Sequence, residues 1–205
     1  MSDISLAIKQ LVSGGCIIIR DDQHRENEGD LVCAAYNCSA ENINFMAVHG
    51  RGMICMPLSF DKVNQLELTL QPKRGSGLFQ TAFTTSIDAA VGVTTGISAH
   101  ERALTIRTAA KQDCLPEELA TPGHIFPLRA NKNGLLARKG HTEASLAIMQ
   151  LAKLPDSAVV CEILNMDGSM ARHDDLLLLA DKFKLPFVSI EAIESAFRAS
   201  LLLEK

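Results

Sequence analysis

The sequence has no tryptophan and a single tyrosine, so it lacks the aromatic side chains on which the bases of single-stranded nucleic acids stack. It also lacks an excess of positive charge: 24 acidic residues outnumber 20 lysines and arginines, and the formal net charge is −4. Binding to a phosphate backbone depends on such an excess. The composition therefore argues against nucleic acid as the main partner.

Paired cysteines and long apolar segments are also missing. The six cysteines form no C-x-x-C pair, and several lie in strand-like runs, where cysteine behaves as a small buried hydrophobe. This pattern argues against a disulfide framework and a structural zinc site, and it favours a reducing cytosol. No apolar run reaches the roughly 18 residues of a transmembrane helix, and the N-terminus does not resemble a signal peptide. We expect a cytoplasmic protein with no membrane partner.

Apolar material for a core is abundant, since 47% of the 205 residues are hydrophobic. A chain of this length is expected to form one domain, residues 1–205, and no linker or internal repeat divides it. Helical and strand-like segments alternate, but not strictly. This pattern predicts an α/β (α+β) fold with a mixed, twisted sheet and helices on both of its faces.

Apolar periodicity and capping signals predict the individual elements. Helices are expected at 3–13, 39–49, 60–66, 98–111, 138–151, from 174 onward and at the C-terminus. Strands are expected at 16–19, 31–35, 53–56, 81–88, 124–129, 159–164 and 187–190. The third strand should stop at Pro57, and residues 121–123 should form a connection. Residues 71–77, with two basic residues among glycines, are either a plain exposed loop or a flexible flap.

Residues 21–30, between the first two expected strands, are unusually acidic: five of the ten are carboxylates. Crowding like charges beside a core costs free energy through repulsion and desolvation. A bound cation, or a substrate that requires several acid and base groups, would offset that cost. The alternative is a solvated turn, since acidic turns are common. On this stretch alone the two interpretations have equal weight.

Two loops lead directly into expected helix N-termini, one at 94–96 before Ser98 and the other at 140–142. The free N–H groups and the positive dipole end of a helix N-terminus suit a phosphate. Ordinary capping is the alternative, because every helix needs it. Arg138 favours anion binding at the second loop, since a guanidinium can hold phosphate oxygens in two places.

Two histidines lie in loop positions where they could take part in chemistry. His141 is in a Gly-His-Thr turn, so it could join a carboxylate of the acidic segment in holding a divalent cation. One histidine and one carboxylate leave positions for substrate and water, which fits Mg²⁺ or Mn²⁺. His124, which follows Pro-Gly, is a candidate general acid or base, although its spacing alone does not favour that role.

Glu162 interrupts an apolar strand, where an unpaired buried carboxylate would be costly. It either points to the solvated face of the sheet or acts as a catalytic acid or base. An edge strand would favour the first interpretation, and a central strand the second.

Five ordered blocks of the sequence together resemble the signature blocks of the 3,4-dihydroxy-2-butanone 4-phosphate synthase family, and the resemblance runs from about Ile4 to about Ala196. The blocks are residues 21–30, 92–99, 122–129, 140–144 and 161–163. Two departures from the expected pattern, Gln23 with His24 in the acidic block and Glu101 in place of aspartate, spare the matched site residues.

The resemblance implies a magnesium-dependent lyase of riboflavin biosynthesis, with Mn²⁺ as a possible alternative. The enzyme would convert D-ribulose 5-phosphate to formate and L-3,4-dihydroxy-2-butanone 4-phosphate. The implied fold is a three-layer sandwich, and the implied assembly is a homodimer with its sites near the interface. Because the chain ends at Lys205, we expect the monofunctional form, without a following GTP cyclohydrolase II domain.

The resemblance also assigns roles to residues. Glu26 and His141 would bind the metal. The catalytic residues would be His124 and Glu162, with Asp30 and Glu28 as further candidates. The substrate-binding residues would be Arg25, Glu26, Asp30, Thr95, Arg138, Lys139, Gly140, His141, Thr142 and Glu162, with the phosphate at 138–142.

The implied reaction explains why such residues are required. The ketose loses a C1 proton to form an enediol, then loses a hydroxyl, rearranges its carbon skeleton and expels C4 as formate. Each stage moves protons and builds oxyanion charge, which a metal and several acid and base groups would manage. Glu28, Asp30 and Glu162 are all eligible to take the C1 proton.

Two other classes of protein are the alternatives. A nucleotide- or RNA-binding relative is disfavoured by the acidic balance and by the intact carboxylate and histidine set. A structural or interaction protein would leave the acidic segment and Glu162 unexplained.

Overall fold

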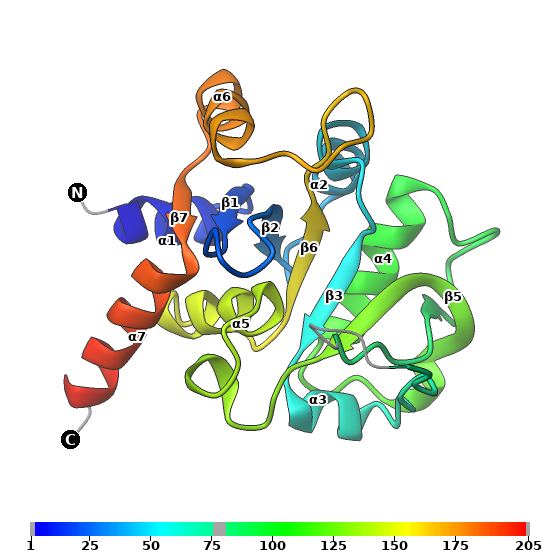
Figure 1. Ribbon diagram of the computed structural model, residues 1–205. Coiled ribbons are helices and arrows are strands. Elements are labelled where there is room, and N and C mark those ends of the chain that lie inside the picture. The colour runs from blue at the N-terminus through cyan, green and yellow to red at the C-terminus, as the bar shows by residue number, and fades with distance from the viewer. Residues whose placement is uncertain (1–2, 76–80, 204–205) are drawn as a thin grey trace.

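The computed structural model describes residues 3–75 and 81–203. Within these residues, a seven-stranded sheet has the order β4-β5-β3-β6-β2-β1-β7 (Figure 1). The strands are β1 (Ile17–Arg20), β2 (Gly29–Ala34), β3 (Cys55–Leu58), β4 (Ile87–Ala89), β5 (Leu119–Arg129), β6 (Ala158–Glu162) and β7 (Phe187–Ser189). The pairs β1/β7 and β3/β5 are parallel, and the other neighbours are antiparallel. The predicted mixed sheet is confirmed.

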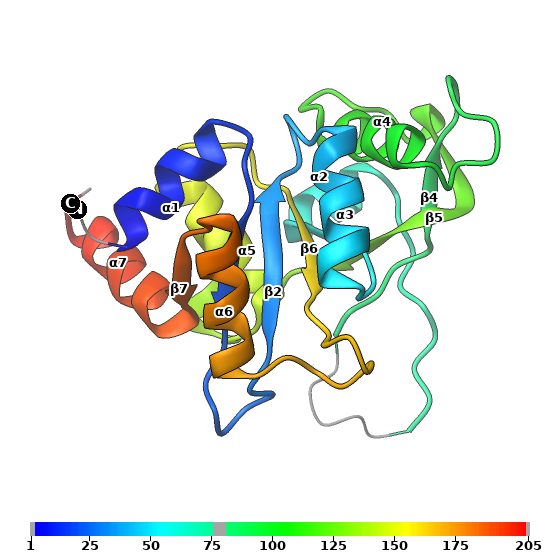
Figure 2. The ribbon, with the colours of Figure 1, turned by 90° about the horizontal axis from the view of Figure 1, so that it is seen from above.

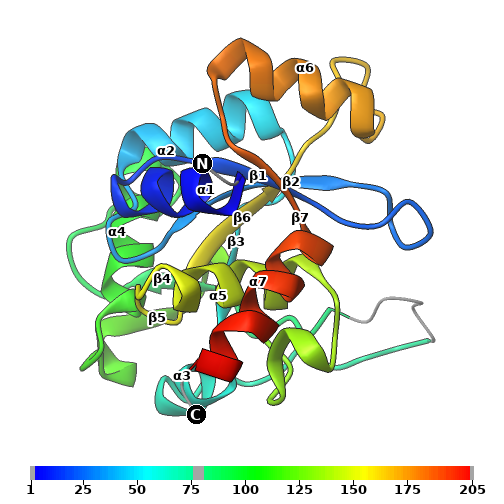
Figure 3. The same ribbon diagram turned by 90° about the vertical axis from the view of Figure 1, so that its left-hand side faces the viewer.

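Helices cover both faces of this sheet, as predicted. They are α1 (Asp3–Val12), α2 (Ala40–Phe45), α3 (Phe60–Gln65), α4 (Ala99–Ala110), α5 (His141–Leu151), α6 (His173–Phe183) and α7 (Ile190–Leu203). In Figure 3, α2 and α6 lie on one side of the strands, and α5 and α7 lie on the other. One hydrophobic cluster contains residues of α2, α3, α4 and α6, and a second contains residues of α1, α5 and α7.

The apolar runs of the central strands follow from burial on both faces. Along β2, Leu31 and Cys33 enter the first cluster, while Val32 and Ala34 enter the second. A strand covered on both sides has no solvated face and so carries no polar alternation. This is why the sequence shows continuous apolar runs here.

Two of the predicted helix starts have complete capping boxes. Ser39 accepts a hydrogen bond from the Asn42 backbone N–H at 3.2 Å, and the Asn42 side chain accepts one from the Ser39 N–H at 2.9 Å. Ser98 and Glu101 form the same reciprocal pair at the start of α4. After α2, a π-helical turn, Met46–Gly50, extends the helical segment to the predicted end near His49.

Several boundaries differ from the prediction. Strand β3 continues through Pro57 to Leu58. Proline is tolerated there because the pairing of β3 with β6 requires no N–H from residue 57. The register pair of these strands is at Cys55, and Leu58 meets Ser157 only through an isolated bridge. Strand β6 ends at Glu162, two residues earlier than predicted.

Strand β5 begins at Leu119, so residues 121–123 lie within a strand and not in a connection. The partner strand β4 is limited to Ile87–Ala89, and the pairing shifts in register between Ile87 and Asp88. Because of this shift, some residues of β5, including Pro122, have no regular partner in β4. A missing N–H is tolerated at such a position.

The sheet brings the acidic segment and the end of β6 together. Gly29 and Asp30, which the sequence assigned to a loop, begin β2, and Asp30 lies directly opposite Glu162 in the antiparallel β2–β6 pair. In Figure 2, the loop after β1 and the turn after β6 extend at the same end of the sheet. Residues 71–75 have no regular structure, and 76–77 fall outside the described residues, so the flap prediction is untested.

Candidate metal and substrate site

A cleft of about 190 Å³ opens at this end of the sheet. Its walls come from the acidic segment, from strands β2, β3, β5 and β6, and from the start of α5. The lining residues are Arg25, Glu26, Glu28, Asp30, Cys55, Thr81, Phe83, Leu128, Arg138, His141, Thr142, Val160 and Glu162. Eight of these were predicted as site residues from the sequence.

Asp30 and Glu162 form the floor of the cleft. Ile163 donates its backbone N–H to the Gly29 carbonyl at 2.9 Å, so the next pair, Asp30 and Glu162, is a non-hydrogen-bonded pair of the ladder. Facing side chains are closest in pairs of this kind. β6 lies at the centre of the sheet, which is the position that favours a chemical role for Glu162 over a solvated one.

Asp21 holds the acidic segment in a compact shape. One oxygen, Oδ2, accepts hydrogen bonds from Arg25 Nη1 at 2.9 Å and from the Glu26 N–H at 3.0 Å. The other, Oδ1, accepts the Glu28 N–H at 2.8 Å. Buried and bonded in this way, Asp21 acts as an internal cap of the segment, much as an N-cap residue collects orphan N–H groups.

Arg172, just before α6, fastens the same segment from outside. Its Nη1 donates to the carbonyls of Glu26 and Asn27 at 2.7 and 2.6 Å and lies 3.8 Å from Glu28 Oε1. Neither Asp21 nor Arg172 was singled out from the sequence. No local pattern marks Arg172, because its partners are far away in the chain.

Glu26 and His141 can hold a cation. Glu26 Oε2 lies 3.6 Å from His141 Nδ1, and these two residues with Asp21 offer ligand atoms within 4.8 Å of one another. His141 Nε2 is buried and has no hydrogen-bond partner among residues 3–75 and 81–203, as expected of a ring whose bonding is completed by another group. A carboxylate and an imidazole, with open positions around them, suit Mg²⁺ or Mn²⁺. The donor set therefore fits such a metal.

The titration of the cleft is strongly coupled. Burial, reinforced by the charges of Glu162 and Glu26, raises the pKa of Asp30 to about 7 even though His141 opposes the shift. Burial alone would lower the pKa of His141, but Asp30 and Glu26 raise it to about 9. Burial and Glu26 also raise the pKa of Glu28. Asp30 can therefore gain and lose a proton near neutral pH.

The start of α5 presents a cationic wall to the cleft. Arg138 Nη1 pairs with Glu143, whose buried carboxylate also accepts the Asn131 N–H at 2.9 Å. A Cβ at Gly140 would displace the Arg138 guanidinium, so glycine allows Arg138 to lie close against the helix N-terminus. Thr142 is buried beside it. An anion here would meet a guanidinium and free N–H groups.

Lys139 points away from this wall. Its Nζ pairs with Glu194 Oε2 of α7 at 2.7 Å, and it lines a neighbouring depression and not the cleft. The predicted role of Lys139 in substrate binding stays a prediction.

Glu162 is held by the segment before β3. The Met53 backbone N–H donates to Glu162 Oε2 at 2.8 Å, and the Gly52 N–H donates to the Glu162 carbonyl at 3.2 Å. A Cβ at Gly52 would lie 2.5 Å from that carbonyl oxygen and 2.6 Å from Oε2. The segment therefore fits closely against the carboxylate, and only glycine fits at position 52.

His124 and Thr95 lie elsewhere, on an exposed surface, and neither lines the cleft of this chain. The His124 Nδ1 is 2.8 Å from Asp88 Oδ2, and its backbone N–H donates to Asp88 Oδ1 at 3.0 Å. A Cβ at Gly96, beside Thr95, would lie 2.7 Å from His124 Nδ1. His124, Asp88 and the 92–97 loop thus form a second cluster, and Asp88 is a member that the sequence did not reveal.

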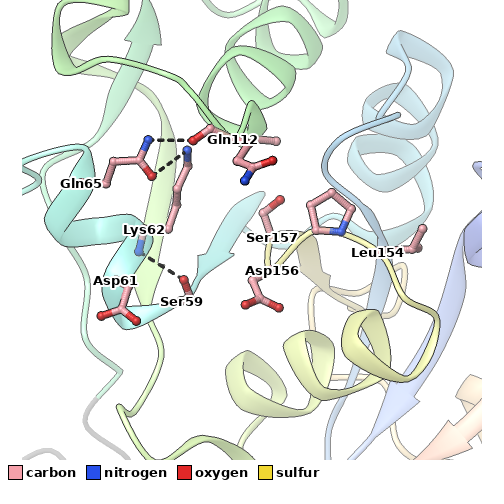
Figure 4. A pocket seen from close by; sticks show the side chains of 10 residues that line it. Ser59, Asp61, Lys62, Gln65, Gln112, Leu154, Asp156 and Ser157 are labelled. Carbon is pink, nitrogen blue, oxygen red and sulfur yellow. Dashed lines mark hydrogen bonds between the residues drawn. The ribbon is translucent and has the colours of Figure 1, made fainter.

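A larger cavity, of about 650 Å³, lies at the opposite end of β6 (Figure 4). None of the residues predicted for the site lines it. Its lysine, Lys62, already donates to the Lys111 carbonyl and, at 3.3 Å, to Gln65 Oε1. The facing pair Asp30 and Glu162 and the Glu26–His141 pair line the cleft at the other end of the strand.

A mixed α/β sheet, paired carboxylates and a carboxylate–imidazole pair beside a cationic helix start are features of a metal-binding enzyme that acts on a small anionic substrate. Comparison with known proteins gives the family. A sequence model of the 3,4-dihydroxy-2-butanone 4-phosphate synthase family matches residues 5–196. The chain belongs to this family.

Individual relatives agree with this assignment. The chain is 48% identical over 189 residues to the riboflavin biosynthesis protein RibBA of Synechocystis sp., covering 91% of this chain and 34% of the relative. It is 45% identical over 205 residues to a 3,4-dihydroxy-2-butanone 4-phosphate synthase of Neisseria meningitidis serogroup A, covering 100% of this chain and 56% of the relative. The chain thus spans about a third to a little over half of the length of these relatives.

A solved structure supports the fold. The crystal structure of a 3,4-dihydroxy-2-butanone 4-phosphate synthase in complex with two magnesium ions superposes with a TM-score of 0.88 at 36% identity. The match covers 94% of this chain and 95% of that structure. The described helices include none that is long and apolar enough to cross a membrane.

Proposed function

We propose that this chain, as a single domain of residues 1–205, converts D-ribulose 5-phosphate to formate and L-3,4-dihydroxy-2-butanone 4-phosphate in riboflavin biosynthesis. The observation that carries the proposal is one cleft in which Asp30 faces Glu162 beside the Glu26–His141 pair and the cationic start of α5. Family membership supports the same reaction, which would classify the enzyme as a lyase. The six free, buried cysteines favour a reducing compartment, and we place the enzyme in the cytoplasm.

Glu26 and His141 would hold a divalent cation, Mg²⁺ or alternatively Mn²⁺. The magnesium complex of the related structure supports Mg²⁺ as the first choice. When bound, the metal supplies positive charge next to the substrate oxygens on which negative charge develops. Arg25, which pairs with Glu26 Oε2, would orient that carboxylate and contribute charge to the same oxygens.

Arg138, Thr142 and the N–H groups around Gly140 would bind the phosphate, and the sugar carbons would then lie near Asp30 and Glu162, which line the same cleft. Asp30, which faces Glu162 in the cleft and whose pKa burial raises to about 7 in the metal-free protein, is our first candidate to accept the C1 proton and return it at a later stage. Glu162, fixed by the Met53 N–H, would handle a second proton. Glu28 remains an alternative base.

A homodimer would complete the site. His124 and Thr95 are exposed and do not line the cleft, yet both belong to the blocks that resemble the family. We propose that they act in the cleft of a second copy across the interface, where His124 would be a catalytic acid or base oriented by Asp88.

The decisive experiment is an assay of formate release by the purified chain with ribulose 5-phosphate and Mg²⁺. We expect turnover that stops with EDTA and returns with Mg²⁺. Glu26→Ala and His141→Ala should each reduce turnover by about 10²-fold or more and weaken Mg²⁺ binding measured by calorimetry, because each removes one of few protein ligands. Glu117→Ala, an exposed carboxylate outside the cleft, is the matched control and should change neither.

Absence of formate from the folded wild-type protein with either metal would overturn the proposed reaction. Unchanged Mg²⁺ affinity in both metal-ligand variants, with turnover retained, would instead reject the metal assignment.

A further inference from the structure

Three cysteine thiols lie side by side at the end of the β1–β2 hairpin away from the cleft. Cys16 comes just before β1, Cys33 is in β2, and Cys38 precedes α2. Cys33 Sγ lies 3.9 Å from Cys38 Sγ, and the Cys16 thiol is near enough to raise the pKa of the Cys33 thiol. All three are buried within the same hydrophobic cluster, so Cys33 is flanked by a thiol on either side.

The register of the hairpin ends at Ile17 and Val32, and Cys16 and Cys33 are the next residues outward on the two chains. Continuing that register by one residue places Cys16 opposite Cys33. The Asp21 N–H donates to the Glu28 carbonyl, which makes that pair hydrogen-bonded. Hydrogen-bonded and non-hydrogen-bonded pairs alternate along an antiparallel ladder. Ile17 with Val32 is therefore a hydrogen-bonded pair, and the next pair, Cys16 with Cys33, would be a non-hydrogen-bonded one.

A non-hydrogen-bonded antiparallel pair has its Cα atoms about 4.5 Å apart. That separation lies within the roughly 4.4–6.8 Å that a disulfide spans without backbone movement. Both side chains point to the same face, because both belong to the cluster that also contains Ile18 and Leu31. Backbone geometry therefore permits a bond between these two sulfurs.

The surroundings distinguish the roles of the two sulfurs. The Asn42 amide donates to Cys16 Sγ at 3.5 Å, and Asn42 is fixed by a further bond to the Gly14 carbonyl at 3.1 Å. The contact with Cys33, reinforced by Asn42 and opposed by burial, lowers the pKa of Cys16, while the same contact raises the pKa of Cys33. Cys16 is 5% exposed and Cys33 and Cys38 are 1% exposed, so a small oxidant would reach Cys16 first.

We propose that Cys16 and Cys33 form a peroxide-sensitive thiol pair that closes into a cross-strand disulfide. The Cys16 thiolate attacks one peroxide oxygen, which breaks the O–O bond, releases hydroxide and leaves a sulfenic acid. Cys33 then attacks Cys16 Sγ, forms the S–S bond and expels hydroxide, which its own proton neutralises. Two thiols and one hydrogen peroxide give one disulfide and two waters.

The consequence would be a covalent closure at the base of the hairpin that carries the acidic segment. The pair lies on the α2 face of the sheet, whereas the cleft lies on the α5 face. We therefore expect the disulfide to leave catalytic turnover within about twofold and to raise the thermal midpoint of the metal-free protein, since closing a loop restricts the unfolded chain.

The test treats the reduced full chain with hydrogen peroxide and maps the products without reduction. Trypsin separates Cys16 from the other two, because cleavage follows Arg20 and Arg25. The single tyrosine, Tyr36, lies between Cys33 and Cys38 and gives chymotrypsin a site that separates those two. We expect the peptide containing Cys16 to be joined to the peptide containing Cys33, with the loss of two hydrogen masses.

Variants make the assignment specific. Cys38→Ser should still form the disulfide, and Cys16→Ser should not. Cys114, buried in the same cluster but without a thiol neighbour in a facing strand, is the internal control and should remain a free thiol. A link between Cys33 and Cys38, oxidation of Cys114 at an equal rate, or sulfinic acid without a link in the wild-type protein would overturn the proposal.

Discussion

Asp30 is the carboxylate of the cleft whose ionisation costs the most free energy, because it is buried among other acidic side chains. It is buried, faces Glu162 across the β2–β6 ladder, and is near Glu26 and Glu28. Such a carboxylate is kept neutral over a wide pH range by its surroundings, which is the arrangement that enzymes use to place an acid or base near pH 7. In the metal-free protein, the nearby His141, with its raised pKa, is an opposite charge that favours ionisation of Asp30.

Replacing Asp30 by asparagine tests its role in catalysis through kcat and its effect on stability through the thermal midpoint. Asp30→Asn should lower kcat by about 10²–10⁴-fold, the range expected for loss of a general acid or base. Retention of wild-type kcat in this variant would exclude Asp30 as the proton acceptor and leave Glu28 and Glu162.

The same variant carries a prediction about stability. The pKa of Asp30 rises from 3.8 to about 7 on folding. Its protonated form therefore favours the folded state fully below pH 4, and this contribution is lost as the pH rises through about 7. In EDTA, the thermal midpoint of the wild type should fall relative to that of Asp30→Asn between pH 4 and 8. An unchanged difference over that range would contradict the raised pKa.

At the level of elements, strands β4 and β5 matter because their pairing joins Asp88 to His124. The register shift between Ile87 and Asp88 changes the course of the ladder beside Gly123, whose missing side chain allows the close approach of the Ile87 and Asp88 backbone. Asp88 then bonds both the ring and the backbone N–H of His124. Two strands therefore orient one imidazole.

Asp88→Asn tests whether that orientation serves catalysis. A carboxylate that fixes an imidazole should affect turnover more than binding, so we expect kcat to fall by about 10- to 100-fold with KM and Mg²⁺ affinity nearly unchanged. Steady-state kinetics and calorimetry measure the two effects separately. The control is Asp181→Asn, at an exposed aspartate on α6. An equal loss of kcat in both variants would show that Asp88 has no particular role in catalysis.

Elements differ in how far their sequence determines them. The N-cap residue Ser39 and the capping box that starts at Ser98 predicted two helix starts correctly, because the capping bonds are local. The extent of β5 could not be predicted, since residues 121–123 join a strand only where β4 supplies a partner. Pro57 was read as a strand end for the same reason: whether its missing N–H matters depends on the neighbouring strand.

The candidate site shows the same division. Its acidic segment, His141 and Glu162 could be identified from unusual residues in apolar or loop contexts, and the resemblance to a family connected them. Arg172 and Asp88 could not, because each bonds to residues far away in the chain. Asp21 belongs to the acidic segment, but its bonds to the Arg25 side chain and to the N–H groups of Glu26 and Glu28 depend on the folded loop. Their roles are visible only in three dimensions.

For the whole molecule, the main feature is that the proposed catalytic groups occupy two separate surfaces of one chain. Glu26, Asp30, His141 and Glu162 line the cleft, and His124 does not. A twofold dimer has one interface in which every contact occurs twice, so His124 of each subunit could reach the cleft of the other.

Mixing two inactive variants tests this arrangement. Co-expression of His124→Ala and Glu26→Ala chains gives hybrid dimers in which one of the two sites is intact, if each site uses both subunits. We expect about a quarter of wild-type activity from a statistical mixture, because half of the dimers are hybrids with one working site. Each variant alone should stay inactive, and no recovery in purified hybrids would place His124 in its own subunit's site.

The pairing of Glu26 with His141 also has a consequence for how the protein folds. Glu26 follows β1 and His141 opens α5, so the two meet only after the distant halves of the chain have joined in one sheet. Contacts between such distant segments form at a high loop-closure cost. A divalent ion that requires both residues would bind the completed fold and not its precursors, and it would therefore slow unfolding while leaving the rate of early hairpin formation unchanged.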